Sequence, residues 1–91
     1  MATDQPGAGL PPIVVYSGPL CSGCAEVKAY LHQQGIAYEE RNIRADMPTM
    51  IEFRRKGYEI LPVIELGAQV IQDYESLAQL ETALRATGYL R

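Results

Sequence analysis

The sequence predicts one three-layer α/β domain with the element order β-α-β-α-β-β-α and a four-stranded mixed sheet. The run at residues 13–16 is β-branched and aromatic, as in strands that are buried on both faces. A helical stretch at 21–34 joins it to a charged strand at 37–43, and such a crossover makes the two strands parallel. A hairpin of short strands at 63–66 and 69–72 makes the sheet mixed, and three helices can cover both faces.

The first helix is expected at residues 21–34, with Gly35 as its C-terminal stop. Helical spacing places Cys24, Val27 and Leu31 on one face, which we expect to be buried. The strand that follows is rich in charged residues. Such charge suits the edge of a sheet, because it discourages pairing with another molecule.

The second helix is expected to begin at an Asp46 cap and to end at Gly57. Its apolar residues are expected to face inward: Met47, Met50 and Ile51. Gly67-Ala68 provides the turn of the hairpin, where a glycine suits the first central position of a type II′ turn. Asp73 is expected to cap the last helix and Gly88 to end it. The leucines of that helix recur at helical spacing: Leu77, Leu80 and Leu84.

The composition of the 91 residues suits a single globular domain, which we place at residues 13–91. Residues 1–12, with three prolines and two glycines, are expected to form a disordered tail. A net charge of −3 gives no general attraction to nucleic acid or to anionic membranes. The chain shows neither a secretion signal nor an apolar run long enough to span a bilayer, so we expect a cytoplasmic protein.

The sequence contains two cysteines, Cys21 and Cys24, at the expected start of the first helix. Free N–H groups and the positive end of the helix dipole favour a thiolate there, and the thiolate is the nucleophilic form of cysteine. We therefore expect Cys21 to attack disulfides. Cys24 lies nearly one turn further along the same face, where it can attack the resulting mixed disulfide and release the reduced partner. Two cysteines at this spacing indicate redox chemistry in a reducing compartment.

From residue 14 to residue 84 the chain resembles the glutaredoxins, a family with the thioredoxin-like fold. The residues that carry the resemblance are Val15-Tyr16-Ser17, Pro19-x-Cys21-x-x-Cys24, Leu61-Pro62-Val63-Ile64 and Ile71. The resemblance implies a thiol–disulfide oxidoreductase that acts on proteins or on glutathione mixed disulfides. Glutathione is the cosubstrate that it implies, with no tightly bound cofactor.

The resemblance also implies a substrate site. The Leu61–Pro62 bond should be cis and lie beside Cys21, with the backbone of Leu61 offered to an incoming peptide. Asp73 and the N–H groups of Tyr74 and Glu75 should meet the γ-glutamyl end of glutathione. Arg54 and Tyr58 are further candidates for contacts with glutathione. The cluster of Arg54 with Arg55 and Lys56 also suits a solvated helix end, and Tyr58 also suits core packing.

Several positions depart from the family pattern and bear on the electron donor. The lysine that many members carry just before the proline is Gly18 here, and the usual Gly-Gly after Ile71 is Gln72-Asp73. The acidic residue near the start of the last helix is Ser76. Because these positions help to hold glutathione in the family, the donor stays open between glutathione and a flavin-dependent thioredoxin reductase.

Metal binding is the alternative to disulfide exchange. Zinc requires four ligands, and the chain adds only His32 as a further soft ligand, so we expect no metal site. A copper(I) module would end in a strand, whereas this chain ends in a helix. An iron–sulfur cluster between two copies is favoured more by relatives with a single cysteine. We therefore expect a monomer whose partners are glutathione, disulfide-containing proteins or thioredoxin reductase.

Overall fold

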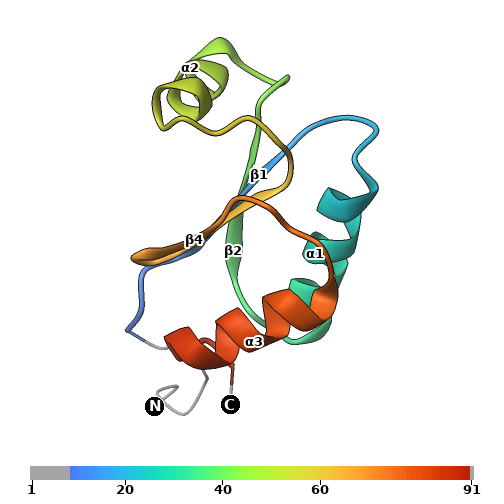
Figure 1. Cartoon of the computed structure of the whole chain (residues 1–91), viewed down its shortest axis with the longest axis vertical. Coiled ribbons are helices and arrows are strands. Elements are labelled where there is room, and N and C mark those ends of the chain that lie inside the picture. Colours follow the sequence, from blue (N-terminus) through green and yellow to red (C-terminus); the bar gives the residue numbers. More distant parts are fainter. Residues whose placement is uncertain (1–8, 91) are drawn as a thin grey trace.

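The computed structural model describes residues 9–90, which contain seven elements in the predicted order. The elements are β1 Ile13–Ser17, α1 Ser22–Gln33, β2 Tyr38–Asn42, α2 Met47–Arg55, β3 Val63–Leu66, β4 Gln69–Ile71 and α3 Leu77–Thr87. The strands form one sheet in the order β2-β1-β3-β4, with α1 and α3 lying together on one side of it (Figure 1). β1 pairs with β2 in parallel, whereas β3 is antiparallel to both β1 and β4. The predicted mixed sheet is confirmed.

The charged strand β2 lies at an edge of the sheet, as predicted. Its Glu40 carboxylate joins three elements, because it accepts hydrogen bonds from the Ser17 hydroxyl of β1 and from the Lys28 ammonium of α1, each at 2.7 Å. The hydrogen bond from Lys28, followed by that from Ser17, holds the pKa of Glu40 below its ordinary value. The charged residue Glu40 therefore helps to hold β1, β2 and α1 together, in addition to any protection of the edge strand against pairing.

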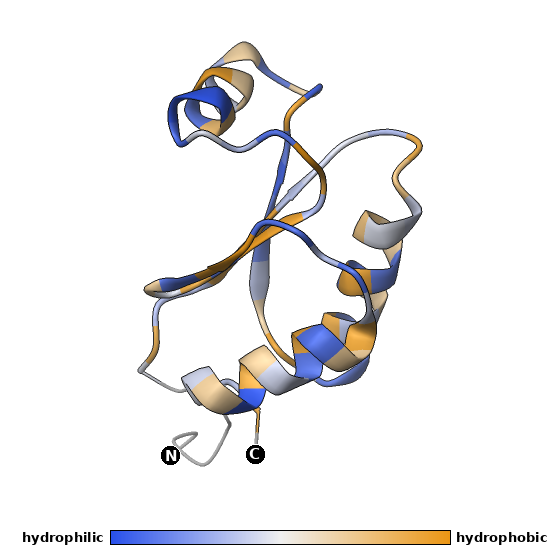
Figure 2. Ribbon diagram, in the orientation of Figure 1, coloured by the Kyte–Doolittle hydropathy of each residue, from blue (hydrophilic) through white to orange (hydrophobic). Residues whose placement is uncertain are grey.

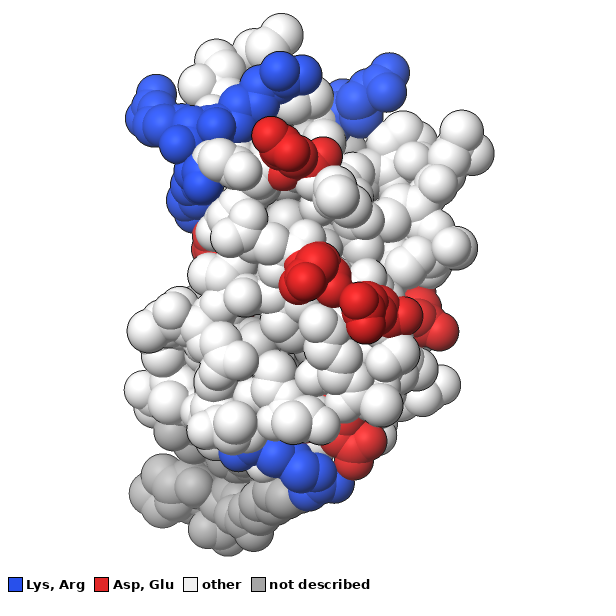
Figure 3. Space-filling view, viewed as in Figure 1, with Lys and Arg blue, Asp and Glu red and all other residues white. Residues whose placement is uncertain are grey.

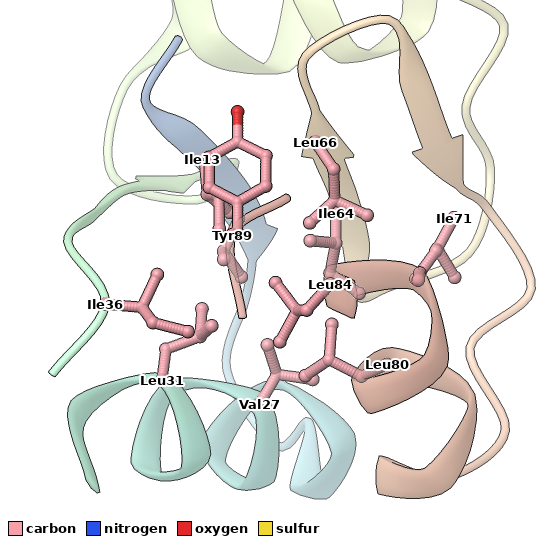
Figure 4. Close-up of a cluster of buried hydrophobic side chains, with 12 residues drawn as sticks. Ile13, Val27, Leu31, Ile36, Ile64, Leu66, Ile71, Leu80, Leu84 and Tyr89 are labelled. Atoms are coloured by element: carbon pink, nitrogen blue, oxygen red, sulfur yellow. The ribbon is translucent and has the colours of Figure 1, made fainter. Parts of the chain in front are cut away.

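Helices α1 and α3 cover one face of the sheet with a continuous apolar layer. In Figure 2 both helices alternate between hydrophobic and hydrophilic residues, as amphipathic helices do. Figure 4 shows Val27 and Leu31 of α1, together with Leu80 and Leu84 of α3, gathered against the sheet residue Ile64. These five side chains are fully buried. The predicted inward face of the first helix, including Cys24, is confirmed.

Helix α2 packs on the opposite face through a small aromatic cluster. Tyr16, Phe53 and Tyr58 contact one another with ring centroids 5.6–5.7 Å apart. The predicted inward face of this helix is wrong for two of its three residues, because Met47 and Ile51 are 67% and 48% exposed, whereas Met50 is half-buried. Phe53 is the buried side chain, and Ile51 lies about 200° around the helix from it, on the solvent side.

Two helix starts test the predicted caps. The Asp46 cap is confirmed, since its side chain accepts a hydrogen bond from the Thr49 N–H at 2.8 Å. The Asp73 cap is wrong, because α3 begins after Ser76, whose hydroxyl accepts from the Gln79 N–H at 3.3 Å. The Gln79 side chain also bonds the backbone before the helix, including the Asp73 carbonyl at 3.3 Å. These bonds hold the residues after Asp73 outside the helix.

The predicted tail at residues 1–12 falls largely outside the described residues. Within its last four residues, the Pro11 carbonyl accepts a hydrogen bond from the Tyr89 hydroxyl. Tyr89 itself is buried just after α3. None of the helices in residues 9–90 combines the length and the apolar character needed to cross a membrane.

Candidate active site

The sheet topology brings three loops together at one end of the strands. Tyr16, near the end of β1, pairs with Val63, the first residue of β3. Ile64 in turn pairs with Ile71, the last residue of β4. The segments that follow β1, precede β3 and follow β4 therefore meet. They carry the cysteine pair, the Leu61-Pro62 peptide and Tyr74, respectively.

Cys21 and Cys24 form a disulfide at the start of α1. Cys21 is the N-cap of the helix, with extended backbone, and its sulfur accepts a hydrogen bond from the Cys24 N–H at 3.1 Å. In most helices this backbone N–H donates to a side-chain oxygen of a serine or aspartate cap, whereas here it donates to the Cys21 sulfur. After reduction, the same N–H and the helix dipole are placed to stabilise a Cys21 thiolate.

The two cysteines differ in how far they are exposed. Cys24 is 2% exposed and lies on the inward face of α1, whereas Cys21 is partly exposed. An incoming disulfide can therefore approach Cys21 but not Cys24. The roles of an outer attacker and an inner resolver stay a prediction, to which this difference in burial is suited.

Pro62 and Tyr74 flank the turn between the cysteines. The Leu61–Pro62 bond is cis, as the resemblance implied. A Cβ atom at Gly23 would lie 3.2 Å from Pro62 Cδ and 3.4 Å from two ring carbons of Tyr74. The glycine between the cysteines thus lets a proline ring and an aromatic ring approach the reactive turn closely.

The Tyr74 side chain is anchored to α1. Its hydroxyl donates a hydrogen bond to the Glu26 carboxylate. Burial, followed by this hydrogen bond, raises the pKa of Tyr74, so the hydroxyl stays protonated. The sequence placed Tyr74 at the site through its backbone, and the structure adds a side-chain contact that the sequence did not reveal. Asp73, its neighbour, is exposed and lies beside the groove between β4 and α3.

Leu61 occupies the space beside Gly18. A Cβ atom at Gly18 would lie 2.7 Å from Leu61 Cδ1, so a side chain at this position would displace Leu61. This is the position at which many glutaredoxins carry a lysine. Leu61 thus lies in the space that the first carbon of any side chain at this position would need.

Two of the predicted substrate contacts, Tyr58 and Arg54, contact other parts of the protein. Tyr58 is 8% exposed and its hydroxyl donates to the Glu65 carboxylate at 2.7 Å, so it packs in the core rather than lining a groove. Burial, followed by that hydrogen bond, raises the pKa of Tyr58 to about 12. Arg54 contacts Met50 within its own helix, its Nε 3.4 Å from the sulfur.

The basic cluster around Arg54 lies on the α2 side of the sheet, across from α1, and Lys and Arg gather over that end in Figure 3. Lys56 is engaged there, because its ammonium donates to Glu65 at 2.8 Å and to the Tyr16 hydroxyl at 3.0 Å. A structural role therefore accounts for Lys56. Across residues 9–90, no group of three or more His, Cys, Asp or Glu side chains is arranged to hold a metal ion.

The sequence interpretation missed Leu20, the residue before Cys21. Its side chain is fully exposed and its backbone is left-handed, with φ of 56°. The signal available in the sequence was an apolar residue isolated in a loop, with no helical or strand partner at the expected spacing.

Part of the chain is similar in sequence to known proteins. The family model described as Glutaredoxin matches residues 13–71. The global transcriptional regulators Spx 1 of Bacillus cereus and Bacillus anthracis are 37% identical over 59 residues, which are 65% of this chain and 42% of theirs. The chain thus spans less than half of the length of these relatives.

Solved structures are similar over most of the chain. A mutant of the thioredoxin-like protein BC3987 is 25% identical, with a TM-score of 0.69 over 79% of this chain and 97% of its own. A glutaredoxin from Brucella melitensis is also 25% identical, with a TM-score of 0.64 over 88% of this chain and 90% of its own. These similarities confirm the predicted fold.

Proposed function

Because the chain belongs to the glutaredoxin family, we propose that it is a thiol–disulfide oxidoreductase that reduces protein or glutathione mixed disulfides through Cys21 and Cys24. The observation that carries this proposal is the pairing of a partly exposed cysteine at a helix cap with a buried cysteine nearly one turn away. The Cys24 N–H is a hydrogen-bond donor for the Cys21 thiolate. An inert structural bridge requires neither feature.

The proposed reaction has two exchange steps. The Cys21 thiolate attacks one sulfur of the target disulfide, which forms a mixed disulfide and releases the other sulfur as a thiolate that takes up a proton. Cys24 then loses its proton and attacks the Cys21 sulfur. The second target thiol leaves, and the Cys21–Cys24 disulfide remains. The target gains two electrons and the cysteine pair loses two.

Two electron donors fit the second half of the cycle. Glutathione is the proposed cosubstrate on the basis of the family, and two molecules would reduce the pair and leave as glutathione disulfide. A flavin-dependent thioredoxin reductase is the second candidate. The packing of Leu61 against Gly18 favours it, because that packing removes a position at which the family holds glutathione. The cytoplasmic location and the monomeric state stay predictions.

A coupled turnover assay tests the proposal. The wild type, Cys21→Ser and Cys24→Ser are given a glutathione mixed disulfide, and the consumption of NADPH is followed with glutathione plus glutathione reductase, or with thioredoxin reductase alone. We expect the wild type to turn over with at least one donor, Cys21→Ser to be inactive, and Cys24→Ser to retain activity with glutathione only.

Absence of turnover with both donors would contradict the proposed function, and so would full activity in Cys21→Ser. An absorbance spectrum of the freshly purified protein tests whether it binds an iron–sulfur cluster. A visible absorbance band that is lost in Cys21→Ser would support a cluster in place of disulfide exchange.

A further inference from the structure

Leu20 combines two properties that folding does not explain. Its side chain is fully exposed, so it buries no apolar surface in the domain. Its backbone is left-handed, with φ of 56°, and it is the non-glycine residue with positive φ within residues 9–90. That conformation is disfavoured for residues with a Cβ atom and is commonly found at functional sites. Asparagine or glycine would fit this backbone better.

The position of Leu20 connects these properties with the reactive sulfur. It directly precedes Cys21, the partly exposed member of the pair. Residues 17–24 carry no charged side chain. Leu61 also covers Gly18, two residues before Leu20, with an apolar group. The loop that carries Cys21 is therefore uncharged, and the Glu26 carboxylate of the same helix is engaged by the Tyr74 hydroxyl. Such a loop suits an uncharged peptide segment better than the charged ends of glutathione.

We infer that Leu20 is a specificity-determining residue, which packs against an apolar side chain next to the target cysteine in a protein disulfide. The inference rests on the proposed function and names its substrate class. The exchange chemistry at Cys21 is unchanged. Only the approach of the target differs, because burying Leu20 against an apolar neighbour favours the encounter with that target.

Two matched peptides test the inference. Each contains a disulfide, and the residues that flank its cysteines are leucine in one peptide and serine in the other. Pre-reduced wild type and Leu20→Asn are mixed with each peptide in single-turnover reactions, which require no donor. We expect the wild type to reduce the leucine peptide about tenfold faster than the serine peptide, as the burial of one leucine side chain implies. Leu20→Asn should lose this preference.

Two controls separate specificity from damage. Met47→Asn replaces another exposed apolar residue, on the far face of the sheet, and should keep the wild-type preference. Leu20→Asn should be at least as stable as the wild type in urea, because asparagine tolerates the left-handed backbone.

The outcomes distinguish this inference from the proposed function. Equal wild-type rates for the two peptides, or an unchanged preference in Leu20→Asn, overturn the role of Leu20 alone. A wild type that reduces neither peptide overturns the proposed function, and the role of Leu20 with it.

Discussion

Gly18 leaves the space that the Leu61 side chain fills beside the reactive loop, with 2.7 Å from a Cβ at position 18 to Leu61 Cδ1. Alanine at position 18 restricts the unfolded chain, which favours folding, but it forces Leu61 out of its rotamer. We predict that the change in the free energy of unfolding caused by Gly18→Ala is about 1 kcal/mol less favourable in the wild type than in Leu61→Ala. Urea unfolding of the four proteins in this double-mutant cycle measures the difference. The same effect in both backgrounds would contradict the packing.

Single residues differ in how far the sequence reveals their roles. Cys21 and Cys24 were predictable, because a pair of thiols at the start of a helix has few other uses in a chain with two cysteines. For Tyr58 the sequence left the groove and the core as alternatives. The choice depends on Glu65 and on the aromatic rings of α2 and β1, which only the folded chain brings near. The left-handed backbone of Leu20 was not predictable either, because a pattern of residue types does not show backbone angles.

The start of α3 distinguishes two capping residues. Ser76 accepts a hydrogen bond from the Gln79 N–H, whereas Asp73 lies outside the helix. We predict that Ser76→Ala lowers the free energy of unfolding by about 1 kcal/mol, as loss of a cap does. Asp73→Ala, the matched control, should change it by less than about 0.5 kcal/mol, as surface substitutions do. Urea unfolding compares the two variants, and a larger loss for Asp73→Ala would refute the observed cap.

The elements themselves were predictable, but their ends and inward faces were less so. Asp73 and Ser76 both precede the apolar helical pattern. The helix begins after Ser76 because the Gln79 side chain bonds the backbone at Asp73 and Glu75. The second helix shows the same limitation. Its apolar residues outnumber those it buries, because one ring, Phe53, fills the space between α2 and the sheet. Side-chain contacts that the pattern does not show decide both cases.

The complete fold followed from the sequence because its constraints agree with one another. A crossover of fixed hand, a short hairpin and a charged edge strand leave few arrangements of four strands, and the observed order β2-β1-β3-β4 is one of them. That arrangement also builds the site. It brings the segments after β1, before β3 and after β4 to the same end of the sheet, where Pro62 and Tyr74 approach the turn between the cysteines.

We propose that this arrangement exposes Cys21 for attack and buries Cys24, which resolves the mixed disulfide. Trapping the intermediate tests it most directly. Reduced Cys24→Ser and reduced Cys21→Ser are each mixed with a protein disulfide, and the products are analysed by mass spectrometry without reductant. Cys24→Ser should accumulate a one-to-one mixed disulfide on Cys21, because no resolving thiol remains, and Cys21→Ser should accumulate none. An adduct on Cys24 of Cys21→Ser, formed at a similar rate, would contradict the account.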